Sequence, residues 1–190
     1  MSIDTPLFEG SLIRLGQIDH ETDPEIVSCW SHDAGFMRMM YTDPMRPLAP
    51  WQVKKEMEKL EKSLEEERNL FHFRIRARKD GRLLGIAEIN RISWTNGTGF
   101  IRLGIGTPAD RRQGYGCEAL GMLLYYAFVE LNLYRLTANI PAYNHPALAL
   151  FKGFGFREEV RRRQALDRDC RYWDLLHFGL LADEWKERQK

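Results

Sequence analysis

The sequence predicts one α+β domain built on a mixed, mostly antiparallel sheet with a single β-α-β crossover. Before residue 106, two strand-like stretches are joined by a short Asp-Gly turn, which is typical of antiparallel neighbours. After it, a long apolar helix separates two further strands, and a helical connection of this kind joins parallel strands. We expect a single domain over 1–190, with its core at about 10–182.

The first part of the chain is expected to form one short strand and two helices. Residues 11–17 read as the strand. Asp23 is expected to cap the first helix, with Pro24 at its first helical position. The second, longer helix opens at Ala49-Pro50, and its apolar residues recur at helical spacing. These residues are Val53, Met57, Leu60 and Leu64.

Residues 71–77 and 83–90 are expected to form a β-hairpin. Apolar residues alternate with His and Arg along the first stretch, which is strand periodicity. Asp80-Gly81 occupies the turn, because this pair tolerates the positive φ values that a tight hairpin requires. A loop then leads to a strand over 98–106.

The crossover helix is expected to run from Gly114 to about Asn132. It is apolar nearly all round, so we expect it to be buried against the sheet. Residues 134–140 then form a strand parallel to 98–106, reached by a right-handed crossover. A further helix and a terminal hairpin complete the order of elements.

The composition is that of a globular protein, with 44% hydrophobic and 29% charged residues. The net charge of +1 gives no case for a nucleic-acid partner, and no apolar run is long enough to suggest a membrane span. The three cysteines are odd in number and far apart, which indicates neither a disulfide framework nor a metal site. Because the N-terminus also lacks the features of a signal peptide, we expect a cytoplasmic protein. The oligomeric state stays open, a homodimer included.

The most informative feature is a glycine loop over 111–116, at the start of the crossover helix. Gly114 and Gly116 have no Cβ, so the backbone can turn sharply and approach a ligand closely. The helix start directs unpaired amides and the positive end of its dipole at the same place. Arg111 and Arg112 add positive charge and bidentate donors. We therefore expect the loop to bind phosphate groups.

Two other phosphate-binding loops fit this sequence less well. A P-loop requires Gly-Lys followed by Ser or Thr after a defined glycine spacing, and no such run occurs. Gly114, Gly116 and Ala119 have the spacing of the dinucleotide-binding fingerprint. However, residues 107–113 separate it from the preceding strand, and Asn139 stands near the position where an acidic residue would bind the ribose. A dinucleotide-dependent oxidoreductase is thus a remote alternative.

Arg111, Gly114 and Gly116, following a strand, resemble the acetyl-CoA pyrophosphate loop of the GNAT N-acetyltransferase superfamily. The resemblance continues downstream at Asn144-His145-Pro146-Ala147, Gly155-Phe156 and Arg171-Tyr172-Trp173-Asp174. The last of these motifs resembles the branch that includes ribosomal-protein N-acetyltransferases. The resemblance implies the acyl-CoA N-acyltransferase fold, with about seven strands and helices on both faces. It also implies acetyl-CoA as cosubstrate and direct attack by a primary amine within a ternary complex.

The resemblance places the coenzyme between the two strands that flank the crossover helix. In the family these strands splay apart, and backbone amides of the first strand hold the pantetheine arm and the thioester oxygen. Asn144 matches an asparagine that reaches this arm, and a helix N-cap is the alternative role of this residue. The expected coenzyme-binding residues are Leu103, Gly104, Ile105, Arg111, Arg112, Gln113, Gly114, Tyr115, Gly116, Asn144, Ala147 and Phe151.

The catalytic groups are less clearly implied, because three positions depart from the family pattern. Phe151 occupies a position that often holds a tyrosine acid, and Ala147 one that often holds serine. Arg102 stands where a glutamate base is frequent. Glu88 is then the best candidate base and Tyr143 a candidate acid. A non-catalytic acyl-CoA-binding protein is the main alternative.

The acceptor is expected to be an amine, either a small molecule or a protein N-terminus. Tyr172 and Asp174, on the last strand, are expected to line the acceptor cleft. The arginine-rich hairpin around 161–171 is expected to be mostly solvated, with an acidic acceptor or the adenosine 3′-phosphate as a lesser alternative. Cys117 is expected to be a small buried residue rather than a nucleophile.

Overall fold

The computed structural model describes residues 6–44 and 46–189. Residues 1–4, on which the signal-peptide expectation rests, lie outside the described residues. The strands are β1 (Ile13–Gly16), β2 (Phe71–Ala77), β3 (Leu83–Ser93), β4 (Thr98–Ile105), β5 (Arg135–Pro141), β6 (Arg157–Arg168) and β7 (Arg171–Leu181). The helices are α1 (Asp23–Ser31), α2 (Ala34–Met40), α3 (Pro50–Glu66), α4 (Tyr115–Tyr125), α5 (His145–Gly153) and α6 (Ala182–Glu187).

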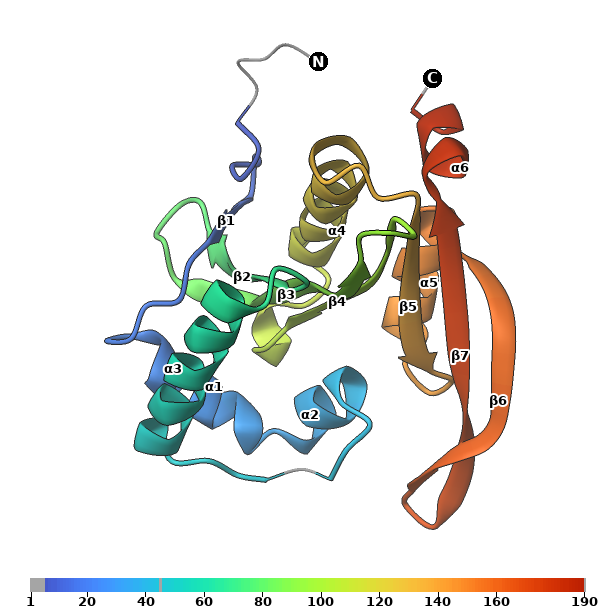
Figure 1. Ribbon diagram of the computed structural model, residues 1–190. Helices are drawn as coiled ribbons and strands as arrows, with labels where there is room; N and C mark the ends of the chain where they lie inside the picture. The colour runs from blue at the N-terminus through green and yellow to red at the C-terminus, as the bar shows by residue number, and fades with distance from the viewer. Residues whose placement is uncertain (1–5, 45, 190) are drawn as a thin grey trace.

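The strands form one sheet of seven in the order β1-β2-β3-β4-β5-β7-β6 (Figure 1). Only β4 and β5 are parallel neighbours, and α4 provides the connection between them. The other neighbouring pairs are antiparallel. The predicted α+β class with a single crossover is therefore confirmed.

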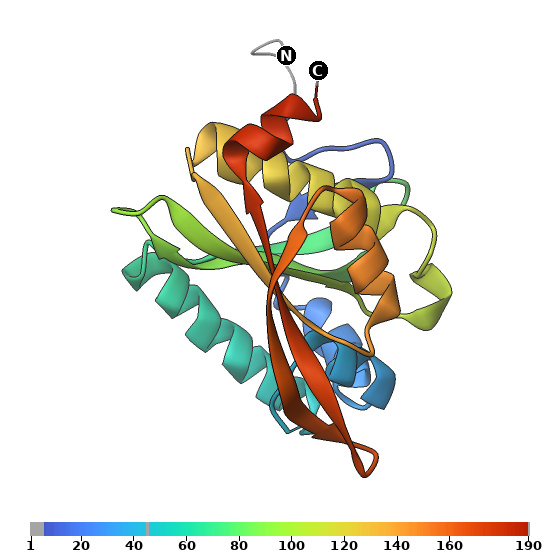
Figure 2. The ribbon, with the colours of Figure 1, turned by 90° about the vertical axis from the view of Figure 1, so that its right-hand side faces the viewer.

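The helices cover both faces of the sheet (Figures 1 and 2). One face carries α4 and α5, whose apolar residues join the main hydrophobic core with Ile75, Ile89 and Phe178. The other face carries α1, α2 and α3, which bury two smaller apolar clusters around Trp30 and Val53. No helix in the described part of the chain is long and apolar enough to cross a membrane.

The start of α1 differs from the expectation. Thr22 is the N-cap residue, and Asp23 is the first helical residue, so Pro24 is the second. Asp23 does not cap the helix, because its carboxylate is completely buried and accepts from the Arg76 guanidinium on β2. Two arginines of β2 approach this carboxylate, and their charge fixes its place in the interior.

Helix α2 was not expected from the sequence. Asp33 caps it by accepting a hydrogen bond from the Gly35 amide at 2.8 Å. Phe36 and Met40 anchor it to Trp30 and to the start of β3. The helix therefore depends on one cap and on tertiary packing, which a short sequence window does not reveal.

The other predicted elements agree closely with the structure. Gly81 has φ 74° in the β2–β3 turn, as the Asp-Gly pair predicts. The helical segment after Gly114 ends near the expected residue, but its last part, Tyr126–Glu130, is π-helical, and Asn132 follows it with φ 52°. The β6–β7 hairpin extends past the rest of the sheet (Figure 2), and β6 is exposed along most of its length, as expected.

Candidate active site

The parallel strands β4 and β5 separate near the middle of the sheet. Their pairing begins at Thr98↔Arg135 and ends at Phe100↔Thr137. Strand β4 nevertheless continues to Ile105 and stays paired with β3 on its other side. Residues 101–105 therefore present backbone groups toward β5 that the sheet does not pair (Figure 1). This is the splayed geometry that the resemblance implied.

The glycine loop connects the end of β4 to α4. Gly114 is the N-cap residue of α4 and has φ 87°, a left-handed conformation that favours glycine. Arg112 also has a positive φ, of 62°. Asp110, at the start of the loop, accepts two short hydrogen bonds from Arg82 of the β2–β3 turn, at 2.6 and 2.7 Å. The loop is thus anchored to the sheet before it reaches the helix.

The first turn of α4 is held from a second direction. The Glu118 carboxylate accepts hydrogen bonds from the amides of Ser11, Leu12 and Ile13. Burial acts to raise the pKa of Glu118, but these hydrogen bonds outweigh it and lower the pKa below its usual value. Glu118 is therefore ionised at neutral pH and ties the chain before β1 to the helix start.

The Arg111 side chain points into the protein rather than freely toward a ligand. Its guanidinium donates to the carbonyls of Ile105, at 3.2 Å, and Gly106, at 2.6 Å. It also pairs with Asp33, the residue that caps α2, at 3.2 Å. Arg111 therefore holds together the end of β4, the loop and α2, which makes it a positioning residue in this structure.

A pocket of about 460 Å³ lies where these elements meet. Seven of the expected coenzyme-binding residues line it from β4, the glycine loop and the start of α4, namely Leu103, Gly104, Ile105, Arg111, Arg112, Gly114 and Gly116. Asn144 and Ala147 line it from the start of α5. The structure thus brings together nine of the twelve expected coenzyme-binding residues around one cavity, and its lining is mostly apolar with a few polar groups.

Three expected coenzyme-binding residues lie outside the pocket lining. Phe151 is buried against Phe156, with ring centroids 4.9 Å apart, so it supports α5 from the core side. Tyr115 is half-buried and packs against the main core. The exposed Gln113 side chain donates to the Ala109 carbonyl. The side chains of Phe151 and Tyr115 therefore support the fold around the pocket, and that of Gln113 is held within the loop.

Asn144 has two structural roles. Its side-chain oxygen accepts from the Ala147 amide at 3.2 Å, which caps α5, and its amide nitrogen donates to the Met39 carbonyl at 3.1 Å. The Tyr143 hydroxyl donates to the neighbouring Arg38 carbonyl at 2.8 Å. Helix α2 is thereby joined to the β5 side of the gap, while Arg111 joins its start to the β4 side.

Glu88 lies on β3 on the opposite face of the sheet from α4. It is buried and forms an ion pair with Arg102 at 2.7 Å, and its other oxygen lies 3.5 Å from His72. Burial acts to raise the pKa of Glu88, but His72 and Arg102 outweigh it, so the pKa falls below its usual value. Glu88 is thus an ionised carboxylate at neutral pH, held close to β4.

The two expected acceptor-side residues are placed differently from each other. Tyr172 is exposed at the far end of the β6–β7 hairpin. Asp174 pairs with Arg161 at 2.9 Å and accepts a hydrogen bond from the Gln164 amide. That hydrogen bond and Arg161 lower the pKa of Asp174, which stabilises the hairpin. Neither residue lines the pocket.

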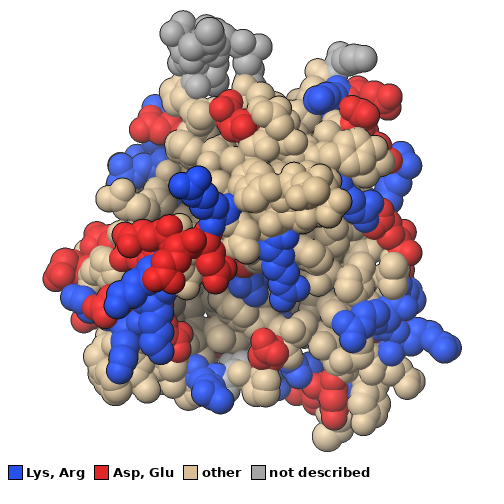
Figure 3. Space-filling model, viewed as in Figure 1, with Lys and Arg blue, Asp and Glu red and all other residues tan. Residues whose placement is uncertain are grey.

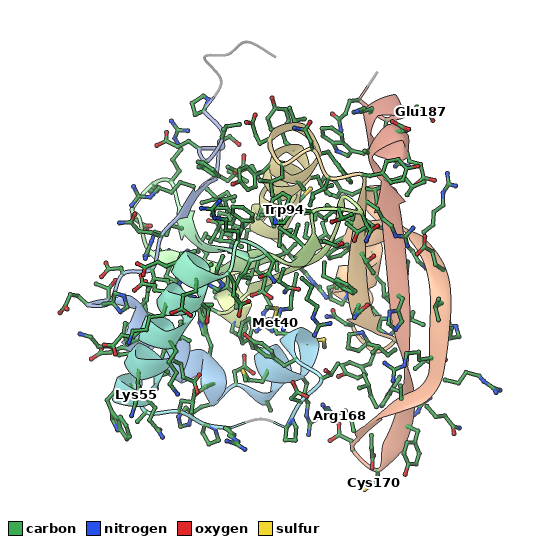
Figure 4. All side chains as sticks on the ribbon, in the orientation of Figure 1. Met40, Lys55, Trp94, Arg168, Cys170 and Glu187 are labelled. Carbon is green, nitrogen blue, oxygen red and sulfur yellow. The ribbon has the colours of Figure 1, made fainter. Side chains whose placement is uncertain are left out.

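Several pocket residues were missed from the sequence, and half of them belong to α2. Met40 lies between α2 and the sheet (Figure 4), and a Cβ on Gly104 would collide with its sulfur. The expectation for Cys117 was wrong, because this residue is exposed and lines the pocket at the first turn of α4. The full set of unanticipated lining residues is Phe36, Met39, Met40, Cys117, Pro146 and Leu150. Among the described residues, no group of three His, Cys, Asp or Glu side chains is arranged to hold a metal ion.

Residues 13–157 match the family model described as "Acetyltransferase (GNAT) domain". The chain belongs to the GNAT acetyltransferase family. The matched range includes β1 to α5 and therefore contains the whole pocket.

Curated GNAT relatives align with part of the chain. YnaD, an uncharacterized N-acetyltransferase of Bacillus subtilis, is 31% identical over 78 residues, which is 41% of this chain and 46% of the relative. "Putative ribosomal N-acetyltransferase YdaF" of the same organism is 29% identical over 107 residues, 56% of this chain and 58% of the relative. The chain thus aligns with about half the length of these two relatives.

Solved structures of acetyltransferases share the fold along nearly the whole chain. A spermidine N-acetyltransferase from Vibrio cholerae, in complex with CoA and spermine, superposes with a TM-score of 0.78 at 19% identity. That match covers 93% of this chain and 99% of the neighbour. A probable acetyltransferase gives a TM-score of 0.79 at 20% identity, covering 93% and 96%. At these identities the likeness establishes the GNAT fold alone.

Proposed function

We propose that the protein transfers the acetyl group of acetyl-CoA to a primary amine by direct attack within a ternary complex. The observation that carries this proposal is the pocket itself. The open edge of β4, the left-handed Gly114 and the start of α4 all border one cavity of about 460 Å³. A phosphate at the helix start and an extended arm along β4 match these two parts of the cavity.

In this proposal the coenzyme is held mainly by backbone groups. The amides of 112–116 bind the pyrophosphate, helped by the exposed Arg112 side chain. The unpaired edge of β4 at 103–105 binds the pantetheine arm, and an amide there stabilises the oxyanion that forms when the amine attacks the thioester. Asn144, Ala147 and the packing of Phe151 complete the pocket from α5.

Glu88 is the proposed base. Its lowered pKa makes this carboxylate a weak base. It therefore removes the proton of the acceptor's ammonium group through a water molecule rather than by direct contact. Tyr143 remains the candidate acid, although its proton is donated to the Arg38 carbonyl in this structure. A thiol has a pKa of about 8.5, so the leaving thiolate departs near neutrality without a strong donor.

A non-catalytic acyl-CoA-binding protein is the second candidate, and one observation favours it. Phe151 and Ala147 offer no proton donor beside the pocket. In both cases we propose a cytoplasmic protein that acts without nucleic acid, membrane or metal, on a small-molecule amine or a protein N-terminus. A homodimer is compatible with either candidate.

Calorimetric titration with acetyl-CoA, CoA and NAD, followed by thiol-release assays on a panel of amines, tests this proposal. We expect both CoA species to bind, NAD not to bind, and at least one amine to accelerate thiol release. Binding of acetyl-CoA without thiol release in the presence of any amine would support the non-catalytic acyl-CoA-binding protein. Tight binding of NAD, with no binding of either CoA species, would instead support a dinucleotide-dependent oxidoreductase.

A further inference from the structure

A layer of polar side chains, most of them buried, lies on the sheet face opposite α4, which the helices α1, α2 and α3 cover (Figure 1). We call it the polar layer, and it consists of Asp23, Tyr41, His72, Arg74, Arg76, Glu88 and Arg102. The strand register places His72 opposite Glu88, and Glu88 opposite Arg102. Side chains at paired positions share a face, so these three lie side by side across β2, β3 and β4.

The charges of the polar layer do not balance. Asp23 is shared by two arginines, lying 2.8 Å from Arg76 and 3.2 Å from Arg74. Glu88 pairs with Arg102. Burial lowers the pKa of His72, so its imidazole is neutral at pH 7. Three guanidinium groups therefore face two carboxylates, and the layer has an excess of one positive charge.

The polar layer also holds buried nitrogen atoms that lack a well-aligned hydrogen bond. These are His72 Nδ1, His72 Nε2, Arg74 Nε and Arg102 Nε, although Arg74 Nε lies 3.2 Å from Asp23 and His72 Nδ1 lies 3.5 Å from Glu88. They are four of the six such side-chain atoms among the described residues. In the described part of the chain, Arg102 Nε and His72 Nε2 have neither a hydrogen bond nor an ion-pair partner, and because buried polar atoms normally have one, this indicates that a further polar or anionic group completes the layer beside them.

Arg102 is the member of the layer that a ligand can reach. Its side chain is 39% exposed, whereas those of Arg74 and Arg76 are 4% and 10% exposed. The Tyr41 ring lies 4.7 Å from its guanidinium carbon and fixes its orientation. A guanidinium has five N–H donors, and the bond to Glu88 uses one of them. Arg102 also lies two residues before Gly104, which lines the pocket.

We propose that the acceptor amine carries a carboxylate and that Arg102 binds this carboxylate at the edge of the polar layer. The inference rests on the proposed function and deepens it by naming the acceptor class. A guanidinium and a carboxylate form paired, charge-assisted hydrogen bonds, which hold the acceptor in one orientation beside β4. The bound anion also neutralises the excess charge of the layer.

The surroundings of Arg102 disfavour a polyamine acceptor. Two carboxylates of this region are already in ion pairs, Glu88 with Arg102 and Asp33 with Arg111. Arg38 of α2 pairs with Asp169, and Arg168 donates to the Thr42 carbonyl just after α2. Figure 3 shows Lys and Arg side chains near the centre of this face, beside a group of Asp and Glu side chains. At the Arg102 guanidinium itself, a cationic acceptor would meet a like charge, whereas a carboxylate would meet an opposite one.

The test compares two matched acceptors, glycyl-glutamate amide and glycyl-glutamine amide, with spermidine as a third ligand. Each is titrated by calorimetry into protein saturated with CoA, so the readout does not require turnover. We expect the glutamate peptide to bind about tenfold more tightly than the glutamine peptide, and spermidine most weakly. Arg102→Gln should remove the preference for the glutamate peptide, and Arg102→Lys should keep part of it. The control is Arg14→Gln, at an exposed arginine on the edge strand β1, which should keep the whole preference.

An unchanged CoA affinity in Arg102→Gln would show that the variant is folded. Equal binding of the two peptides by the wild type, or tighter binding of spermidine, would overturn the inference. Thiol-release assays with the same ligands separate it from the proposed function. Tighter binding of the glutamate peptide without any thiol release would overturn acetyl transfer alone. Equal turnover of both peptides that Arg102→Gln does not change would overturn only the proposal that the acceptor carries a carboxylate.

Discussion

The two faces of the sheet at β4 use different chemistry. On the α4 face and in the gap toward α2, the pocket is bordered by open backbone, glycines and apolar side chains. On the face covered by α1, α2 and α3, the polar layer is built from buried charges that pair across three strands and one helix. The backbone groups that border the pocket lie close together in the sequence, whereas the residues of the polar layer are far apart in it.

This difference has a consequence for stability. The glycines and the open backbone of β4 at the pocket border are free to serve a ligand because they do not support the fold through a side chain. The polar layer must be assembled correctly before it can bind anything, since an unpaired buried charge costs several kcal/mol. We therefore expect substitutions on the two faces to separate into effects on binding and effects on folding.

The largest effect is expected for Asp23→Ala. The substitution removes a completely buried carboxylate and leaves Arg74 and Arg76 without their shared partner. We expect the free energy of unfolding to fall by about 3–5 kcal/mol, measured by urea denaturation. The control is Asp80→Ala, which removes the half-exposed partner of Arg82. A small effect at Asp23, similar to the control, would contradict a charge layer that supports the fold.

The next effect concerns binding. Gly114→Asp places a carboxylate and a strained residue with φ near 87° beside the proposed pyrophosphate site. We expect CoA affinity to fall about 100-fold, which is roughly 2.7 kcal/mol, in calorimetric titrations. Gly153→Asp is the matched control, because a Cβ there meets no atom within 4 Å and the position lies outside the pocket. Unchanged affinity in Gly114→Asp would remove the loop from the site.

The sequence predicts the coenzyme side well because its signals are local. The glycine spacing at Gly114 and Gly116, the strand before it and the apolar helix after it are adjacent in the chain, so their meeting needs no knowledge of the fold. Asn144 was identified by its motif, and the structure shows that its side chain both caps α5 and contacts α2. The single crossover also followed from the order of elements.

The opposite face could not be predicted in the same way. The alternation along β2 indicates a strand, but it does not reveal that helices cover Arg74 and Arg76. Asp23 satisfied the rule for a helix cap, and tertiary ion pairing overrode that local preference. Helix α2 is only seven residues long and owes its place to the packing of Met40 and to the ion pair between Asp33 and Arg111. Each of these features depends on contacts between residues that are far apart in the sequence.

A pH titration sharpens the comparison further. The folded-state pKa of His72 is lowered, so the unfolded chain binds a proton more readily, and stability is lost as the pH falls below the unfolded value of about 6.5. Around His72 lie Glu88, Arg74 and Arg102, and the lowered pKa of Glu88 adds a further loss below about pH 4.5.

Between pH 7.5 and 5.5 we expect the free energy of unfolding to fall with a slope of at most about 1.4 kcal/mol per pH unit for each such histidine. His72→Gln should reduce this slope. His177→Gln is the control for the second histidine whose pKa burial lowers, on β7 outside the polar layer. A slope that only His177→Gln reduces would show that His72 does not titrate with folding.

The smallest expected effect tests how closely a ligand approaches α4. A Cβ on Gly116 would lie 3.9 Å from Leu103, Ile105 and Leu150, which is ordinary contact, so Gly116→Ala should fold normally. We expect CoA affinity to fall roughly fivefold, about 1 kcal/mol, because the methyl group enters the pocket. Gly121→Ala, in the same helix but facing Phe154, is the matched control and should leave affinity unchanged. Because alanine favours helix, neither variant should lose stability, so a lower affinity in Gly116→Ala alone reports contact between the ligand and the helix backbone.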